Sequence, residues 1–224
     1  LISIVMLLLM TSWSYANDIY VTQSGASLDL DITQDGQNNT VGNSTTSSAS
    51  AGASTTLNID QIGNSNVITY QINGATYTGV INLVGNSNNV DLNCDSTGNN
   101  SSCGTANAVI NFTGNSNDID LDIGQTSSAN TADVDIVGQS GSDSNVVAAT
   151  VDGNSAILTI TINGDTNNYL IDIDGNGDVN GHTLIHSHTG GTADVDIVQS
   201  GINDQYINLT TSGDNHDIDI QQTD

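Results

Sequence analysis

Residues 57–72 read LNIDQIGNSNVITYQI, and this stretch decides the fold that we predict for the chain. Aliphatic and polar side chains alternate in residues 57–62 and again in residues 67–72. A period of two places the aliphatic side chains on one face of a β-strand and the polar ones on the other. Residues 63–66 between them, Gly-Asn-Ser-Asn, are typical turn residues. The stretch therefore predicts a strand, a tight turn and a second strand.

The turn and the alternating pattern recur along the chain. Gly-Asn-Ser-Asn is repeated at residues 85–88 and 114–117, at intervals of 22 and 29 residues. Period-two alternation is also found in residues 28–32, 118–123, 158–162 and 217–220. A unit of about 22 residues cannot bury its apolar face alone, whereas stacked copies can. We therefore predict an all-β fold, a β-solenoid of stacked strand–turn–strand repeats of about 22 residues. A β-sandwich is the alternative, because it also consists of regularly spaced short strands.

Three stretches interrupt the repeat, and we expect loop insertions near residues 43–56, 94–106 and 175–191. The first is a low-complexity segment of Ser, Ala, Gly and Thr, and the third is rich in Gly and His. The second contains Cys94 and Cys103, which flank a polar segment. In an oxidising compartment we expect a disulfide between these two cysteines to pin the loop.

The beginning of the chain has the pattern of a targeting signal. Residues 1–10 are almost entirely apolar, and the small residues Ser14 and Ala16 fit the cleavage rule for a secretory signal peptide. The run starts without a Met or a basic segment, so we interpret residues 1–16 as a fragment of such a peptide. Residues 17–224 would then be a secreted, extracellular repeat domain. The alternative is a buried N-terminal helix.

The composition excludes several classes of function. The 224 residues include no Lys or Arg, and the formal net charge is −25. Without cations the chain cannot displace counterions from nucleic acid or bind an anionic membrane. Asp-x-Asp pairs such as Asp133 and Asp135 share the solvent face of a strand, and nothing suggests a pocket that would set their pKa values apart. We therefore predict that the protein is not an enzyme.

Amide residues occupy fixed places in the repeat. The pattern Q-x-G-x-x-N occurs with Gln34, Gly36 and Asn39, and again with Gln61, Gly63 and Asn66. Its first residues recur at Gln139 and Gln199. One amide per repeat can hydrogen-bond to its copy in the next repeat and so form a ladder along the stack. The alternative is that these residues only form turns.

This motif, followed by a second amide at Gln71, resembles the curlin repeat of curli fibre subunits. In the family pattern the last Gln falls six residues after the Asn, and here it falls five residues after. In later units the Gln is replaced, and the residues in comparable places are Val84, Thr113 and Ile162. The resemblance implies secretion, a cross-β fibre, adhesion and a biofilm matrix, with further copies of the chain and cell or abiotic surfaces as partners.

Two clusters suggest metal binding. Asp172, Asp174, Asn176 and Asp178 match the first half of a calcium loop, although its twelfth position is Thr183 in place of Glu. Calcium is thus the one cofactor that we consider, and an ordinary Asp/Gly turn is the alternative. His182, His186 and His188 follow, and we interpret them as surface histidines in a loop, with a weak zinc or copper site as the alternative.

These observations favour a secreted structural protein that forms or nucleates curli-like amyloid fibres for adhesion. The alternative is a monomeric, calcium-stabilised β-solenoid adhesin or surface-fibre binding module, which the charge of −25 favours. An ice-binding solenoid is a third hypothesis. It would need a flat Thr-x-Thr array, and Thr159 and Thr161 form one clean pair in a predicted strand.

Overall fold

The computed structural model describes most of the repeat domain. The described residues are 17–36, 38–42, 48–63, 65–94, 104–124, 131–139, 143–152, 155–174, 181–201 and 205–223. The predicted signal segment, residues 1–16, lies outside them. No helix long and apolar enough to cross a membrane is found within these ranges.

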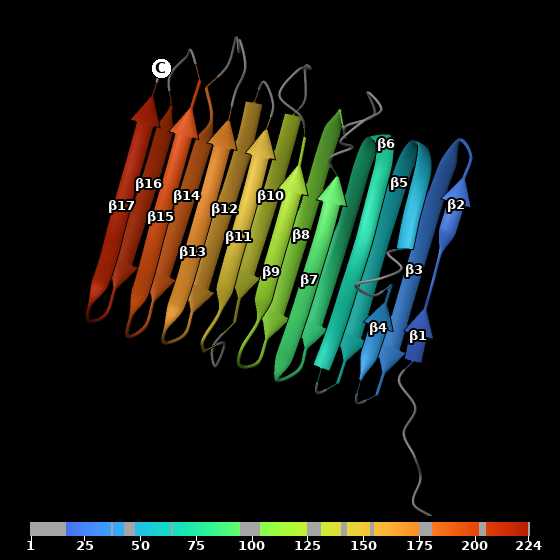
Figure 1. Ribbon diagram of the computed structural model, residues 1–224, viewed down its shortest axis with the longest axis horizontal. Helices are drawn as coiled ribbons and strands as arrows, with labels where there is room; N and C mark the ends of the chain where they lie inside the picture. The colour runs from blue at the N-terminus through green and yellow to red at the C-terminus, as the bar shows by residue number, and fades with distance from the viewer. Residues whose placement is uncertain are drawn as a thin grey trace, which may run out of the picture.

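The described ranges contain β-strands and no helix (Figure 1). The strands are β1 (Asn17–Ile19), β2 (Thr22–Ser24), β3 (Ser27–Asp35), β4 (Asn39–Val41), β5 (Ser48–Ile62), β6 (Ser65–Val84), β7 (Ser87–Cys94), β8 (Thr105–Thr113), β9 (Asp118–Ile123), β10 (Thr131–Gly138), β11 (Val146–Asp152), β12 (Ser155–Asn163), β13 (Asn167–Asp174), β14 (Thr183–Thr189), β15 (Ala193–Ser200), β16 (Tyr206–Ser212) and β17 (His216–Thr223).

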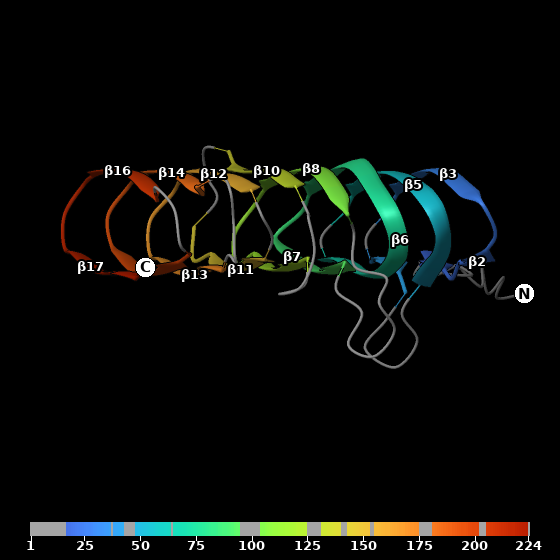
Figure 2. The same cartoon turned by 90° about the horizontal axis from the view of Figure 1, so that it is seen from above.

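Alternate strands stack into two parallel layers, which Figure 2 shows from above. The front layer, nearest the viewer in Figure 1, contains β1, β2, β4, the first parts of β5 and β6, and β7, β9, β11, β13, β15 and β17. The back layer contains β3, the second parts of β5 and β6, and β8, β10, β12, β14 and β16. The chain thus winds around one core, and the predicted all-β solenoid is confirmed.

The repeat length varies along the solenoid. Asn66 stacks on Asn88, 22 residues further along the chain, whereas Asn88 stacks on Asn117, 29 residues further. The shortest repeat equals the predicted one. The longer repeats arise because the segments between strands take up the extra residues, as between β7 and β8, while the strands remain in register.

The core consists of inward side chains that stack in columns. In one column Ile32, Ile59, Ile81, Ile110, Ile136 and Ile160 lie in register on successive strands of the back layer. All six are buried. Complete burial of an aliphatic side chain of this size contributes about 1.5–3 kcal/mol. The alternation that predicted the strands is therefore also what fills the interior.

Two of the predicted loop insertions contain strand residues. Residues 48–56 belong to β5, and residues 183–189 form β14. Small and β-branched residues extend readily when a parallel neighbour is already in place, so low complexity did not prevent pairing. Residues 43–47 and 175–180 lie outside the described ranges. Between Cys94 at the end of β7 and Thr105 at the start of β8, residues 95–103 are also outside them.

Candidate functional site: polar columns and open ends

A ladder of asparagines runs through the core next to the turns. Asn66 Nδ2 donates to Asn88 Oδ1 (2.8 Å), Asn88 to Asn117 (2.5 Å), Asn117 to Asn145 (2.6 Å) and Asn145 to Asn167 (2.6 Å). The five side chains are at most 4% exposed. Buried amides that satisfy one another fix the register of the stack, because a slipped strand would leave them without partners.

The same backbone conformation precedes three ladder residues. Ser116, Ser144 and Thr166 have φ values of 59°, 58° and 59°, and each lies immediately before a ladder asparagine. Such left-handed residues are uncommon outside glycine and persist only where the surroundings hold them.

Asn39, predicted to stack, is also buried and donates to Ile62 O (2.8 Å).

The motif predicted only part of this ladder. Asn66 belongs to a predicted Q-x-G-x-x-N copy, whereas Asn88, Asn117, Asn145 and Asn167 were missed as ladder residues. The repeated Gly-Asn-Ser-Asn turn, which ends at Asn88 and Asn117, was the signal that could have found them.

The glutamine ladder of the back layer has two members. Gln61 Nε2 donates to Gln34 Oε1 (2.5 Å), and both side chains are buried. The column continues with the apolar or small residues Leu83, Phe112, Gly138 and Ile162. Val84 and Thr113, which the sequence placed there, lie one residue further and on the outside. Gly36 and Gly63 stack closely, since a Cβ on Gly63 would lie 2.2 Å from Gly36 O.

Gln71 and Gln139 lie outside the interior ladders. Gln71 follows the inward Asn66 by five residues, an odd number, so it points outward in the strand and is partly exposed. Gln139 is exposed because Gly138 holds the inward position, and its Oε1 accepts a hydrogen bond from Thr113 Oγ1 (3.3 Å). Both placements differ from the prediction because the motif does not reveal which way an individual side chain points.

Gln199 begins a second glutamine pair in the front layer. Gln222 Nε2 donates to Gln199 Oε1 (2.9 Å), and Gln199 is completely buried. Gln222 was not predicted, since it lacks the glycine of the motif.

The cysteine and calcium predictions fall partly outside the described residues. Cys94 is disulfide-bonded, and Cys103, the other cysteine of the chain, is not described. Asp172 points outward from β13, while Asn176, Asp178 and the side chain of Asp174 lie outside the described part. Within that part, no three His, Cys or Asp side chains are grouped so that they could hold a metal ion.

The interpretation of His182, His186 and His188 as surface residues was wrong, because all three are completely buried. His186 and His188 alternate with outward residues on β14 and therefore both point into the core. His182 lies before β14, and its Nδ1 accepts a hydrogen bond from the Ala156 N–H (3.1 Å). The stretch was taken for a loop because polar residues obscured its period of two.

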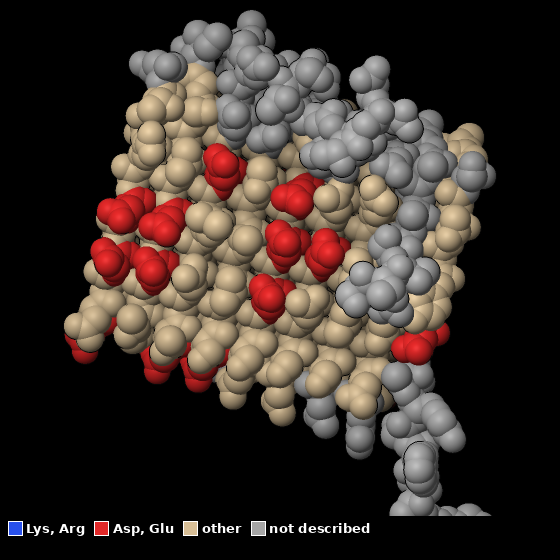
Figure 3. All heavy atoms as spheres, viewed as in Figure 1, with Lys and Arg blue, Asp and Glu red and all other residues tan. Residues whose placement is uncertain are grey.

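The front layer carries an acidic surface, which Figure 3 shows. Many carboxylates of the solenoid stack on neutral amides of the neighbouring strand. Two examples lie on the back layer, where Asn58 donates to Asp31 (2.8 Å) and Asn82 donates to Asp60 (2.6 Å). Direct stacking joins Asp91 to Asp120, Asp194 to Asp217 and Asp196 to Asp219. Burial, and then the Asp122 carboxylate, raises the pKa values of both Asp91 and Asp120. Neutral residues between the aspartates of a column therefore remove part of the repulsion that uniform aspartate columns would have.

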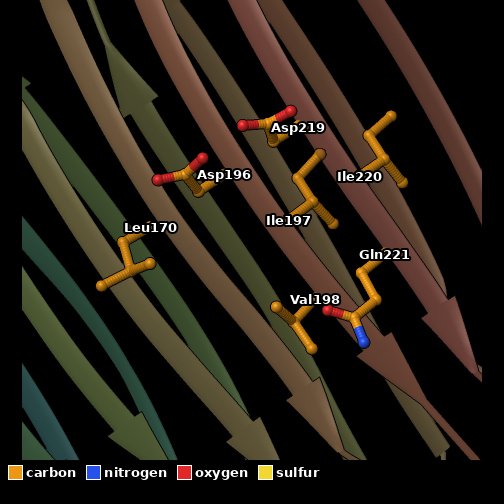
Figure 4. Close-up of a pocket in the computed structure, with 7 residues that line it drawn as sticks. All are labelled: Leu170, Asp196, Ile197, Val198, Asp219, Ile220 and Gln221. Atoms are coloured by element: carbon orange, nitrogen blue, oxygen red, sulfur yellow. The ribbon is translucent and has the colours of Figure 1, made fainter.

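A shallow hollow lies at the C-terminal edge of the front layer. Figure 4 shows its lining, in which Asp196 and Asp219 lie close to Ile197, Ile220 and their neighbours on β13, β15 and β17. Ile197 is 1% exposed, whereas Ile220, its register partner on β17, is 48% exposed. The difference arises because no described strand covers β17.

Comparison with known proteins finds no family model, no curated protein and no solved structure that matches this chain. The resemblance to curlin repeats thus depends on the sequence motif alone.

Both ends of the described solenoid expose inward positions. At the C-terminal end, Ile218 is 38% exposed, although its register partner Val195 is completely buried. At the N-terminal end, Ile19, Leu28 and Leu30 are only partly buried. Strands β17, β16 and β3 are edge strands, and unpaired edges of this kind can pair with another chain.

Proposed function

We propose that this is a secreted structural protein whose solenoids stack end to end into an extracellular fibre that serves adhesion. The observation that carries the proposal is the match between the two open ends. If a second copy continues the register, its β1–β3 would lie on β17 and β16 of the first copy.

Apolar columns continue across such a junction. The column that contains Ile32 leads through successive strands to Leu209, and the column that contains Leu30 leads to Ile207. In the front layer, the column of Ile19 leads to Ile218. Docking would therefore cover with apolar side chains the inward positions that are open in the single chain.

Polar columns also continue across the junction. Gln23 stacks on Ser50 of β5 and, where the β6–β7 register is continued by one residue, belongs to the front-layer column that ends with Gln199 and Gln222. Its Oε1 is buried and has no hydrogen-bond partner among the described residues. Gln23 of a second copy would stack on Gln222 and extend the ladder that Gln222 makes with Gln199.

The distribution of charge allows the two ends to approach. On the back layer, Asp29 and Asp31 of β3 would stack on Tyr206 and Asn208 of β16, a strand without an aspartate. Asn208 beneath Asp31 repeats the amide–carboxylate pairing of Asn58 with Asp31. On the front layer, Asp18 would stack on Asp217, which makes one like-charge pair. A chain with no cations can form an end-to-end contact only if such pairs are few.

Secretion and adhesion are supported by other features. The disulfide at Cys94 persists in oxidising compartments. The acidic front layer disfavours lateral association of solenoids, so growth along the stack is favoured. The curlin-like motif supports a fibre in an adhesive matrix.

A charge placed at one end tests the proposal. Ile218→Asp introduces a carboxylate at the junction, and Ile185→Asp introduces one on the outer back surface. The two side chains are both 38% exposed, so the variants are matched. We expect Ile185→Asp to form fibres like the unmodified protein and Ile218→Asp to remain monomeric, as judged by sedimentation and negative-stain electron microscopy.

Equal fibre growth in both variants would refute the end-to-end junction. A protein that stays a soluble monomer under all conditions would refute the fibre and favour the binding-module alternative.

A further inference from the structure

Three histidines and a tyrosine gather in the core of the last rungs, where a rung is one circuit of the chain around the solenoid. The Tyr169 ring from β13 lies edge-on to His186 (centroids 4.4 Å apart) and to His188 (5.8 Å) on β14. The His188 ring lies 5.2 Å from that of His216 on β17. This histidine cluster occupies the rungs that carry the C-terminal docking end.

The contact of His188 with the Asn167 amide favours a neutral ring. Its Nδ1 lies 3.0 Å from Tyr169 Oη and 3.3 Å from Asn167 Nδ2. Burial raises the pKa of Tyr169, so its hydroxyl keeps its proton and can either donate or accept. The amide nitrogen can only donate, so a proton on Nδ1 would face the N–H group of Asn167.

His186 has no acceptor for a second proton. Neither of its ring nitrogens has a hydrogen-bond partner among the described residues, and the side chain is completely buried. An imidazolium in this position would be a buried charge without compensation, which is strongly unfavourable. Burial, and then the nearby His188, lowers the pKa of His186 to about 4.

Among the described residues, few titratable groups face the cluster. These are Tyr169 from β13, His216 from β17 and Asp165 in the turn before β13. The inward side chains of β12, β15 and β16 are uncharged. Burial and His216 lower the pKa of His188, while Asp165 acts in the opposite direction. No carboxylate is therefore placed to neutralise both histidines.

We infer that protonation of His186 and His188 opens the rungs from β14 to β17, so that the C-terminal end is formed at neutral pH and lost in mild acid. The opening is a property of the single chain. Its consequence, that acid stops end-to-end growth, rests on the proposed function.

The sign follows from proton uptake. Both histidines have lowered pKa values in the closed state, so the open state binds more protons as the pH falls from 6.5 toward 4. Each histidine then raises the opening constant by up to about tenfold per pH unit. Between about pH 7 and about pH 5, His186 alone accounts for roughly a twentyfold increase.

Amide hydrogen exchange of the intact monomeric protein tests this inference. We expect protection in β14–β17, corrected for the intrinsic exchange rate, to fall about twentyfold or more between about pH 7 and about pH 5, while β6–β8 stay protected. His186→Ile replaces the imidazole with the residue type of Ile160, its neighbour in the column. His188→Asn leaves a polar atom near the position that Nδ1 occupies in the unmodified protein. The double variant should lose the acid response.

Asp219→Asn is the matched control. It removes a carboxylate from the outer face of the same rungs and leaves the histidines in place, so it should open in acid like the unmodified protein. An acid response that is unchanged in the double variant, or that is equal in β6–β8 and β14–β17, would overturn the inference.

Histidine NMR of the unmodified protein gives a second test that needs no variant. Protonation of His186 and His188 should coincide with the loss of protection in β14–β17, and protonation within a closed, protected core would overturn the inference. Acid opening in a chain that never forms fibres would leave the inference intact and refute the proposed function. Fibres that grow from a chain without acid opening would leave the proposed function intact and refute the inference.

Discussion

A buried asparagine can both donate and accept in the direction of the stack, which an aliphatic side chain cannot. Asn117 uses both capacities, since it accepts from Asn88, donates to Asn145 and also donates to Gly114 O (2.6 Å). Its removal therefore leaves several buried groups without partners, and each such group costs about 1–3 kcal/mol.

We predict that Asn117→Leu lowers the free energy of unfolding by about 2–5 kcal/mol, because the side chain keeps its volume and loses its amide. The measurement is chemical denaturation monitored by circular dichroism. Asn111→Leu is the matched control, because Asn111 bonds to Asn82 Oδ1 (2.8 Å) on the outer surface. We expect this control to cost less than about 1 kcal/mol. Equal effects of the two variants would contradict the role of the ladder.

At this scale the sequence predicted the kind of residue better than its orientation. Gln34, Gln61 and Asn66 were expected in ladders and are bonded in them. Gln71 and Gln139 were expected there and point outward. Repeated motifs show that a residue recurs, whereas the side on which it lies depends on the parity of its distance from the core positions.

The strands are held in place by columns in which large and small side chains complement one another. Phe112 on β8 is followed in its column by Gly138 on β10. A Cβ on Gly138 would lie 2.8 Å from two ring carbons of Phe112. The glycine therefore accommodates the aromatic ring of the neighbouring strand.

We predict that Gly138→Val destabilises the protein by about 1–3 kcal/mol, the typical cost of overpacking a core. Phe112→Ala should itself destabilise the protein by about 3–5 kcal/mol, because it leaves a cavity. The variant with both Gly138→Val and Phe112→Ala should be more stable than the sum of the two single destabilisations predicts, because the valine fills part of the cavity that the phenylalanine leaves. Chemical denaturation of the four proteins measures this coupling, and strict additivity would contradict the packing.

The sequence predicted strands where apolar residues alternate strongly and failed where the alternating residues are small or polar. Residues 158–162 were expected to form a strand and lie in β12. Residues 183–189, Thr-Leu-Ile-His-Ser-His-Thr, also alternate, but the inward histidines were read as solvent-exposed. Parallel neighbours on both sides determine the structure of such a segment, and these contacts are not local in sequence.

At the scale of the whole molecule, a strongly acidic surface is combined with two open ends of the described solenoid. The chain's charge of −25 is distributed so that many aspartates stack on Asn and the back-layer strand β16 carries none. The composition predicted the acidic surface. The register of the two ends could not be predicted, because it depends on which residues of the first and last rungs share a column.

The most direct test of the account is a disulfide across the end-to-end junction. In a stacked fibre, Asp18 and Asp217 of adjacent copies lie in register, whereas Asp18 and Asp219 are two residues apart along the strand. Cysteines on register-matched parallel strands lie within the Cα separation of about 4.4–6.8 Å that a disulfide requires. The chain with both Asp18→Cys and Asp217→Cys should therefore form covalent chains of many subunits on a non-reducing denaturing gel. The chain with Asp18→Cys and Asp219→Cys should stay mostly monomeric, and equal cross-linking in the two, or none in either, would contradict end-to-end stacking in register.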